Sequence, residues 1–250
     1  MLIKYFFNLQ MDIKQLIRLT LNFLHLDITK NLEYDRLTRL IMKKVINEGS
    51  NCIDVGCHKG EILDTIIKRS PNGKHFAFEP IPYLFKQLKS KYNLKASIYP
   101  YALSDSSGTT TFQLVKNAPA YSGIKKRSYQ VEVPDIEEIT VELKTLDEMI
   151  PADIKIDLIK IDVEGGEFGV LKGAKNLLKK YKPVIVFESG LGASDYYGTN
   201  PADLYSYITL EIGLKISTLK SFINKGNKLS LVEFESAFNT NREYYFIAYP

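Results

Sequence analysis

From residue 51 onward, short apolar runs alternate with segments whose apolar residues recur at helical spacing. We expect strands at 51–56, 74–79, 96–102, 157–162, 183–188, 214–219 and 244–248. Helices are expected at 61–69, 83–92, 167–181 and 202–212. Since strand, helix and strand in succession form a βαβ unit, this alternation predicts an α/β fold with a mostly parallel sheet.

The first 50 residues do not share this alternation. Two amphipathic helices are expected at 12–26 and 33–48, so we divide the chain into a helical appendage, 1–50, and a domain, 51–250. Charged residues interrupt the first apolar stretch before it is long enough to span a bilayer. We expect these helices to pack on the domain or on a second copy of the chain, and peripheral contact with a membrane stays open.

Composition narrows the classes of partner. The 33 Lys and Arg residues nearly balance the 29 Asp and Glu residues, so we do not expect a nucleic-acid partner. The two cysteines, Cys52 and Cys57, have the spacing of neither a disulfide framework nor a zinc finger. A reducing, cytoplasmic location is therefore expected.

Residues 109–146 interrupt the strand and helix alternation. Strands are expected there at 109–115, 130–133 and 140–144, because apolar and polar residues alternate. The polar segment 116–129 contains Gly and Pro and is expected to be a loop. We interpret this loop as a flap over a substrate.

The turn after the first expected strand indicates a nucleotide site. Gly56 and Gly60 allow the backbone to turn tightly and to approach a ligand closely. Glu79 ends the next strand, where a carboxylate in such folds accepts hydrogen bonds from ribose hydroxyls.

Two residues of this turn discriminate between nucleotides. A dinucleotide fingerprint would have glycine at the position of His58, and Asp54 would repel a pyrophosphate. Asp54 would instead attract the ammonium group of a methionine moiety. The turn therefore favours S-adenosylmethionine over NAD. The segment after the third strand contains Ser104 and Asp105, which are either an adenine contact or simply a turn.

The fourth expected strand ends in three carboxylates, Asp162, Glu164 and Glu167. Like charges this close destabilise the fold unless a cation, a proton or hydrogen-bond donors offset them. They could supply a general base, contacts to a sugar-like acceptor or ligands for a divalent metal. We favour Asp162 as the base, with Glu164 next, and we do not expect a metal.

Other polar residues near this strand have weaker assignments. Glu167 is expected to be a favourable charge in the first turn of a helix, and Lys160 to pair with a neighbouring carboxylate. His58 is a further candidate for the base, although a loop histidine covering the cofactor is the simpler interpretation. Glu188, at the end of the fifth strand, could line the acceptor side.

Taken together, five motifs resemble the FkbM family of S-adenosylmethionine-dependent methyltransferases. They are Asp54-Val-Gly56-x-x-x-Gly60, Phe78-Glu79-Pro80, Ala102-Leu-Ser-Asp105, Thr145-Leu-Asp147 and Ile159-Lys-Ile-Asp-Val-Glu-Gly-Gly-Glu167. The chain departs from the pattern at Cys57-His58, where many members have Ala-Asn, and at Gly166, where His is common.

The resemblance implies a class I methyltransferase fold, with a seven-stranded Rossmann-like sheet of order 3-2-1-4-5-7-6 whose seventh strand is antiparallel. It implies S-adenosyl-L-methionine as cofactor and O-methylation of a hydroxyl on a sugar, glycan or natural product. The expected cofactor-binding residues are Asp54, Gly56, Gly60, Glu79, Pro80, Ser104 and Asp105. The alternative is an inactive cofactor-binding or scaffold protein with the same fold.

Overall fold

The computed structural model describes residues 29–129 and 131–250. Its main sheet has seven strands in the order β3-β2-β1-β7-β8-β10-β9. These strands are β1 (Cys52–Val55), β2 (His75–Phe78), β3 (Ser97–Tyr99), β7 (Leu158–Ile161), β8 (Val184–Glu188), β9 (Lys215–Thr218) and β10 (Tyr245–Tyr249). Only β10 runs antiparallel to its neighbours, which confirms the predicted order and the antiparallel seventh strand.

The central strands are apolar because helices cover both of their faces. Every residue of β1, β2 and β7 is buried, and Ile53 lies in register between Phe76 and Ile159. Parallel strands buried on both faces have continuous apolar runs of this kind. The exception is the cross-strand pair Asp54 and Lys160, two charged residues in the middle of the sheet.

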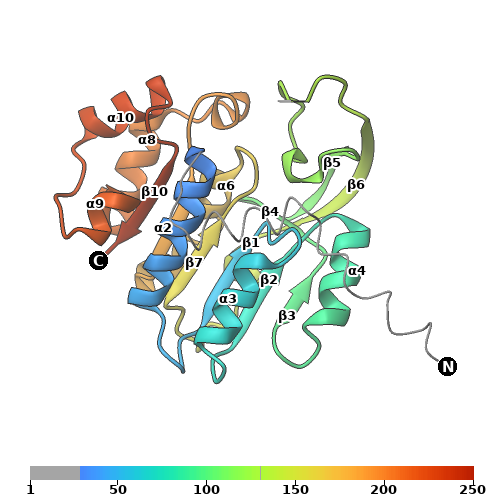
Figure 1. Ribbon diagram of the computed structural model, residues 1–250, viewed down its shortest axis with the longest axis horizontal. Helices are drawn as coiled ribbons and strands as arrows, with labels where there is room; N and C mark the ends of the chain where they lie inside the picture. Colours follow the sequence, from blue (N-terminus) through green and yellow to red (C-terminus); the bar gives the residue numbers. More distant parts are fainter. Residues whose placement is uncertain (1–28, 130) are drawn as a thin grey trace.

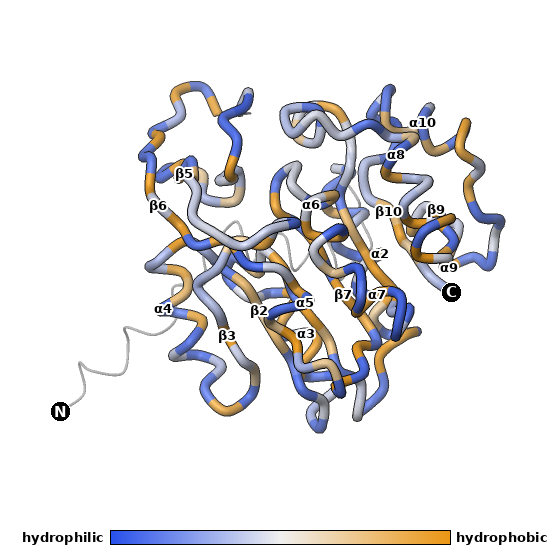
Figure 2. Tube along the Cα trace, turned by 180° about the vertical axis from the view of Figure 1, so that it is seen from behind, coloured by the Kyte–Doolittle hydropathy of each residue, from blue (hydrophilic) through white to orange (hydrophobic). Residues whose placement is uncertain are grey.

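Helices form one layer on each face of the sheet (Figure 1). One layer contains α2 (Lys30–Val45), α3 (Glu61–Arg69), α4 (Pro82–Lys91) and α9 (Leu219–Ile223). The other, seen from behind in Figure 2, contains α5 (Leu146–Met149), α6 (Glu167–Lys172), α7 (Lys175–Tyr181), α8 (Pro201–Ser206), η3 (Tyr207–Ile212) and α10 (Leu231–Thr240).

Helix α2 is packed directly on this sheet. Leu37 and Ile41 are buried against Val186 and Ile247, and each buried side chain of this size contributes roughly 1.5–3 kcal/mol. Thr29 caps the helix by accepting a hydrogen bond from the backbone N–H of Leu32. The helix expected at 12–26 lies outside the described residues, and the division of the chain at residue 50 stays a prediction.

Two expected helices are each divided in the structure. The segment 167–181 forms α6 and α7, which are separated at Gly173 and Ala174. Gly173 lies close to the segment after β4, where a Cβ would be 2.0 Å from the carbonyl oxygen of Ser104. The segment 202–212 forms α8 followed by the π-helical η3. Helices α9 and α10, between β9 and β10, were not predicted.

A second, three-stranded sheet has the order β4-β6-β5, where β4 is Ala102–Leu103, β5 is Gly108–Val115 and β6 is Ile136–Lys144. The prediction of a strand at 130–133 was wrong, because residues 131–133 are bends and one continuous strand pairs with the whole of β5. The expected third strand is also shorter, since Ala102 pairs with Leu143 in this second sheet. The hairpin buries Phe112 and Val141 against α4.

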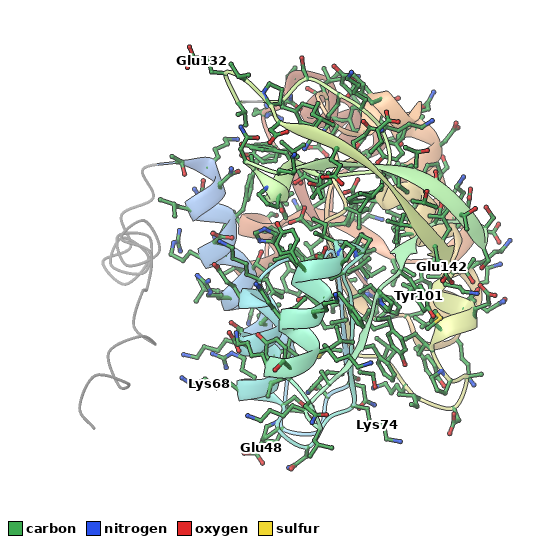
Figure 3. All side chains as sticks on the ribbon, turned by 90° about the vertical axis from the view of Figure 1, so that its right-hand side faces the viewer. Glu48, Lys68, Lys74, Tyr101, Glu132 and Glu142 are labelled. Carbon is green, nitrogen blue, oxygen red and sulfur yellow. The ribbon has the colours of Figure 1, made fainter. Side chains whose placement is uncertain are left out.

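The flap, residues 116–129, rises from this hairpin. Figure 3 shows Glu132, between the flap and β6, at the opposite end of the molecule from Glu48 and Lys74, which precede β1 and β2. The flap therefore lies at the end of the sheet where the parallel strands terminate. Ligands of open α/β sheets bind at this edge. Among the described helices, none is long and apolar enough to cross a bilayer.

Candidate active site

Two cavities lie side by side at the carboxyl edge of the sheet. The first has a volume of about 290 Å³ and is lined by residues that follow β1, β2 and β4, by the turn 162–169 and by part of the flap. The second has a volume of about 990 Å³ and is lined by α2, the flap, and residues at the ends of β7, β8 and β10. Among the described residues, Ala120, Asp162 and Glu164 line both cavities.

The first turn requires glycine at positions 56 and 60 for different structural reasons. Gly56 has φ +75°, and a Cβ there would lie 1.8 Å from the carbonyl oxygen of Asp162, so this turn can pass beneath the acidic turn only without a side chain. Gly60 precedes α3, and a Cβ there would lie 2.4 Å from the hydroxyl of Tyr92. Gly56 lines the first cavity, whereas Gly60 lines neither cavity and packs against α4.

Glu79 is held in place by two backbone N–H groups. Its oxygens accept hydrogen bonds from His58 at 2.8 Å and Ile81 at 2.9 Å, and Glu79, His58 and Pro80 all line the first cavity. Burial raises the pKa of Glu79 to about 7, although the two hydrogen bonds act to lower it. A carboxylate with this orientation suits the hydroxyls of a ribose.

Asp54 is buried in the middle of β1 and lines neither cavity. Its Oδ2 atom is buried and has no hydrogen-bond partner among the described residues. Burial raises the pKa of this carboxyl to about 7, while the charge of Lys160 opposes the shift. Direct contact of Asp54 with the ammonium group of a cofactor therefore stays a prediction.

The lining of the first cavity also contains apolar and charged side chains. Phe112 and Phe168 contribute apolar surface, and Ser104, Asp105 and Lys172 contribute polar groups. Lys172 lies 2.7 Å from Asp105 and holds the pKa of that carboxyl below its ordinary value. Apolar side chains together with a few polar groups suit an adenine ring and its exocyclic amine.

Asp162 is fixed by two donors, one from β7, the strand that it follows, and one from the start of β10. Its Oδ2 atom accepts hydrogen bonds from Lys160 Nζ at 2.9 Å and from the Tyr245 hydroxyl at 2.6 Å. Burial acts to raise the pKa of Asp162, but Lys160 and Tyr245 hold it below its ordinary value. The ionised carboxylate is therefore the favoured form, and Lys160 pairs with a neighbouring carboxylate as expected.

Glu164 has an uncommon backbone conformation, and its side chain forms an ion pair. Its φ is +60°, a region that costs a non-glycine residue roughly 1–2 kcal/mol. Its side chain forms an ion pair with Arg127 of the flap, which also donates to the carbonyl oxygen of Gly192 at 3.1 Å. Burial and Asp162 raise the pKa of Glu164, and Arg127 opposes this shift.

Glu167 begins α6, as expected, but its side chain is held inside the protein. It is almost completely buried, and its Oε1 atom accepts hydrogen bonds from the backbone N–H groups of Val163 at 3.0 Å and Gly165 at 3.1 Å. Glu167 therefore closes the acidic turn from below. Burial raises the pKa of Glu167 to about 7, against these hydrogen bonds.

A third carboxyl group, that of Glu188, completes a cluster with Asp162 and Glu164. Each of the three offers an oxygen within 4.8 Å of the others. Burial raises the pKa of Glu188 well above its ordinary value, and the neighbouring carboxylates add to this effect. Lys160 and Arg127 pair with two of the three carboxyl groups, Asp162 and Glu164, and the expectation of no metal stays a prediction.

Tyrosines of the short helix η2 (Ser194–Tyr197) hold the flap in place. The hydroxyl of Tyr197 accepts hydrogen bonds from the backbone N–H groups of Ile124 and Lys125, at 3.1 and 3.2 Å. The hydroxyl of Tyr196 accepts one from Ser128 at 3.3 Å. With Arg127, these bonds join the flap to the loop after β8. The roles of Arg127 and Tyr245 were not predicted, since their partners are distant in the sequence.

Comparison with known proteins identifies the family. Residues 54–213, more than half of the chain, match the model of the methyltransferase FkbM domain. The chain belongs to the FkbM family of methyltransferases. Because this is a family of methyltransferases, the match supports S-adenosyl-L-methionine as the cofactor. The first cavity fits this cofactor, because its lining combines an oriented carboxylate with apolar side chains.

Two similar proteins give context. The chain is 34% identical over 116 residues to the hexuronic acid methyltransferase AglP of Haloferax volcanii. The aligned region covers 44% of this chain and 45% of that protein. The crystal structure of an FkbM methyltransferase from Methylobacillus flagellatus KT superposes with a TM-score of 0.50 and 15% identity, over 82% of this chain and 44% of that chain. The chain thus spans less than half the length of each, and the structural likeness concerns the fold.

Proposed function

We propose that this methyltransferase transfers a methyl group to a hydroxyl of a sugar, glycan or natural product. The cofactor occupies the first cavity, and the acceptor enters the second. One observation carries this proposal: Asp162 and Glu164 line both cavities, so both ligands meet at these carboxylates. Similarity to a hexuronic acid methyltransferase supports a sugar-related acceptor.

The residues of the first cavity have separate tasks in this proposal. Gly56 and Pro80 bring the backbone close to the cofactor, and Glu79 accepts hydrogen bonds from its ribose hydroxyls. Ser104 and Asp105 contact its adenine. When bound, the cofactor supplies an electrophilic methyl group on a positively charged sulfur atom. His58 lines only the first cavity, which supports a role as cover of the cofactor rather than as base.

Asp162 orients the acceptor hydroxyl and accepts its proton. Lys160 and Tyr245 both donate to one oxygen of this carboxylate, Oδ2, so its plane is fixed before the acceptor arrives. We assign the other oxygen, Oδ1, to the acceptor hydroxyl. Holding the hydroxyl in line with the methyl group contributes more to the rate than proton removal does. Glu164 provides a second polar contact to the acceptor.

The Asp162→Asn variant tests this assignment. The amide keeps the size of the side chain but cannot accept a proton, so we expect methyl transfer to fall by ~10²–10⁴-fold. Binding of S-adenosylhomocysteine, measured by calorimetry, should stay close to that of the unmodified protein, and Glu164→Gln should lose less activity. Wild-type turnover by Asp162→Asn would show that another group removes the proton.

Three further expectations stay predictions: a cytoplasmic location, the contact of the N-terminal helices with a second copy of the chain or with a membrane surface, and the lack of a nucleic-acid partner. Sedimentation of the full chain, with and without residues 1–28, tests the second of these.

A further inference from the structure

Three neighbouring strands bring polar side chains together at the second cavity. Strands β7 and β8 are parallel, and Ile161 is in register with Phe187. The residues that follow these two, Asp162 and Glu188, therefore lie side by side. On the other side of β8, Tyr245 of β10 is the partner of Glu188, and its hydroxyl donates to Asp162 at 2.6 Å. All three side chains line the second cavity.

The carboxyl cluster at this level contains one more acidic group than the cations paired with it. Lys160 pairs with Asp162, and Arg127 pairs with Glu164. Glu188 forms no ion pair with any residue that the structure describes, although it offers an oxygen within 4.8 Å of oxygens of the other two carboxyl groups. When carboxyl groups lie this close without a cation for each, one of them keeps its proton near neutral pH.

The surroundings favour Glu188, rather than Asp162, as the group that keeps the proton. Lys160 and Tyr245 donate hydrogen bonds to Asp162, which stabilise its ionised form. Burial and the neighbouring carboxylates raise the pKa of Glu188 well above its ordinary value. A hydrogen bond between Glu188 and Asp162 helps to hold the pKa of Asp162 low. The protonated Glu188 carboxyl donates this bond, because an ionised carboxylate can only accept.

The groups that face Glu188 come from every element packed around it. They are Lys160 and Asp162 of β7 and its end, Glu164 and Glu167 of the acidic turn, and Tyr244 and Tyr245 where β10 begins. Asp35 of α2 and Arg127 of the flap line the same cavity. Acidic groups outnumber the cations in this set, which favours the neutral form of Glu188.

We infer that Glu188 is a positioning residue for Asp162: the two carboxyl groups share one proton, which Glu188 donates in a hydrogen bond that keeps Asp162 ionised and fixed in front of the acceptor hydroxyl. The inference rests on the proposed function, in which Asp162 accepts the proton of that hydroxyl. Glu188 keeps its own proton in this step, and the pair then releases one proton to solvent. Glu188 thus acts through Asp162 and is not itself the base.

Carbon-13 NMR of the full chain, with the carboxyl carbons of glutamate labelled, tests for the shared proton. The chain is loaded with S-adenosylhomocysteine and titrated from about pH 5 to about pH 10. The signal that disappears in Glu188→Gln belongs to Glu188 and should report a protonated carboxyl group at pH 7. In Asp162→Asn, this signal should titrate at least about one pH unit lower, because its anionic partner is gone.

The exposed Glu142 of β6 provides the matched control for these spectra. Glu142→Gln removes a carboxyl group outside the cluster and should leave the Glu188 signal unchanged. An ionised Glu188 at pH 7, or an unchanged titration in Asp162→Asn, would overturn the inference.

Two substitutions of Glu188 separate its role as a donor from a purely structural role. Here the carboxyl carbons of aspartate are labelled, and Asp162 is identified by the signal lost in Asp162→Asn. In Glu188→Leu the donor is gone, so the pKa of Asp162 should rise by at least about one unit. In Glu188→Gln the amide can still donate, so this pKa should stay low. Equal shifts in the two variants would refute the role of Glu188. Because no methyl transfer is measured, this result and that of the Asp162→Asn activity assay can fail independently.

Discussion

The first and second cavities differ in how their walls are assembled. The first is built largely from turns that directly follow strands, and it orients Glu79 through backbone N–H groups. The second collects side chains from α2, the flap and β10, and the Tyr34–Glu243 hydrogen bond joins residues 209 positions apart. In the proposed function, a cofactor common to many enzymes is thus bound by local structure, whereas the acceptor is bound through long-range contacts.

The largest effect is expected where the first turn passes the acidic turn between the two cavities. In Gly56→Ala, a Cβ 1.8 Å from the Asp162 carbonyl oxygen would force the two turns apart, so we expect a loss of at least ~3 kcal/mol in the free energy of unfolding. Gly198→Ala is the matched control, because Gly198 also has positive φ but a Cβ there would meet no atom within 4 Å beyond its chain neighbours. Urea unfolding measures both, and the control should lose ~1 kcal/mol. Equal losses would contradict the close approach.

The next effect concerns Glu167, which supports the turn from below. Its pKa in the folded protein, about 7, is above its ordinary value of 4.5, so its contribution to stability is present below pH 4.5 and is lost as the pH rises through 7. Glu167→Gln keeps an oxygen acceptor and does not ionise. As the pH rises through this range, the unmodified protein should therefore lose stability relative to Glu167→Gln. The difference between their free energies of unfolding should change by up to ~3 kcal/mol in favour of the variant.

Urea unfolding at several pH values measures the Glu167 effect as a difference, in which the other titrating groups largely cancel. Glu142→Gln should show no such trend, because its side chain is exposed. A constant difference between Glu167→Gln and the unmodified protein would mean that Glu167 does not change its protonation state there.

Glu79→Ala should separate the two cavities. It removes the acceptor of two backbone N–H groups and of the ribose hydroxyls, so the affinity for S-adenosylhomocysteine should weaken by ~1–3 kcal/mol. Calorimetry with p-nitrophenyl β-glucoside, a sugar probe for the second cavity, should show an unchanged affinity. Parallel loss of both affinities would indicate that the cavities are less independent than their linings suggest.

The smallest effect concerns Tyr245, a positioning residue. Tyr245→Phe removes a hydrogen bond that lowers the pKa of Asp162, so this pKa should rise and the acid limb of kcat/KM should move to higher pH. At neutral pH the rate should fall by ~3–10-fold, the equivalent of one hydrogen bond. Tyr249→Phe, on the same strand, should change neither. An unshifted pH profile would exclude this role.

The difference between the cavities also explains what could be predicted. Strand and helix periodicity predicted a mostly parallel sheet, and the resemblance to the FkbM family implied its strand order. The glycines and Glu79 lie within a short stretch whose spacing has a direct structural meaning. Arg127 and Tyr245 could not be found in this way, because a flap arginine or a strand tyrosine has no local pattern that identifies its partner. Helix α10 did have one, since Ser230 and Glu233 form a capping box.

The continuous strand β6 was missed for a different reason. Residues 136–139 contain two glutamates beside isoleucines, and only the pairing of Ile136 with Val115 shows that the strand begins there. Likewise, the side chain of Glu167 turns back to the backbone N–H groups of Val163 and Gly165, and the surrounding fold buries it, although it begins a helix. Tertiary packing often overrides local preference in this way.

Helix α2 lies before the start of the family match at residue 54, yet it forms part of the wall of the second cavity and none of the first. Its outward residues can change without disturbing cofactor binding, provided that Leu37 and Ile41 remain buried on the sheet. Evolution can therefore diversify substrate choice through a segment that domain-based alignment leaves out, and exchanging this helix between relatives offers a route to altered acceptors.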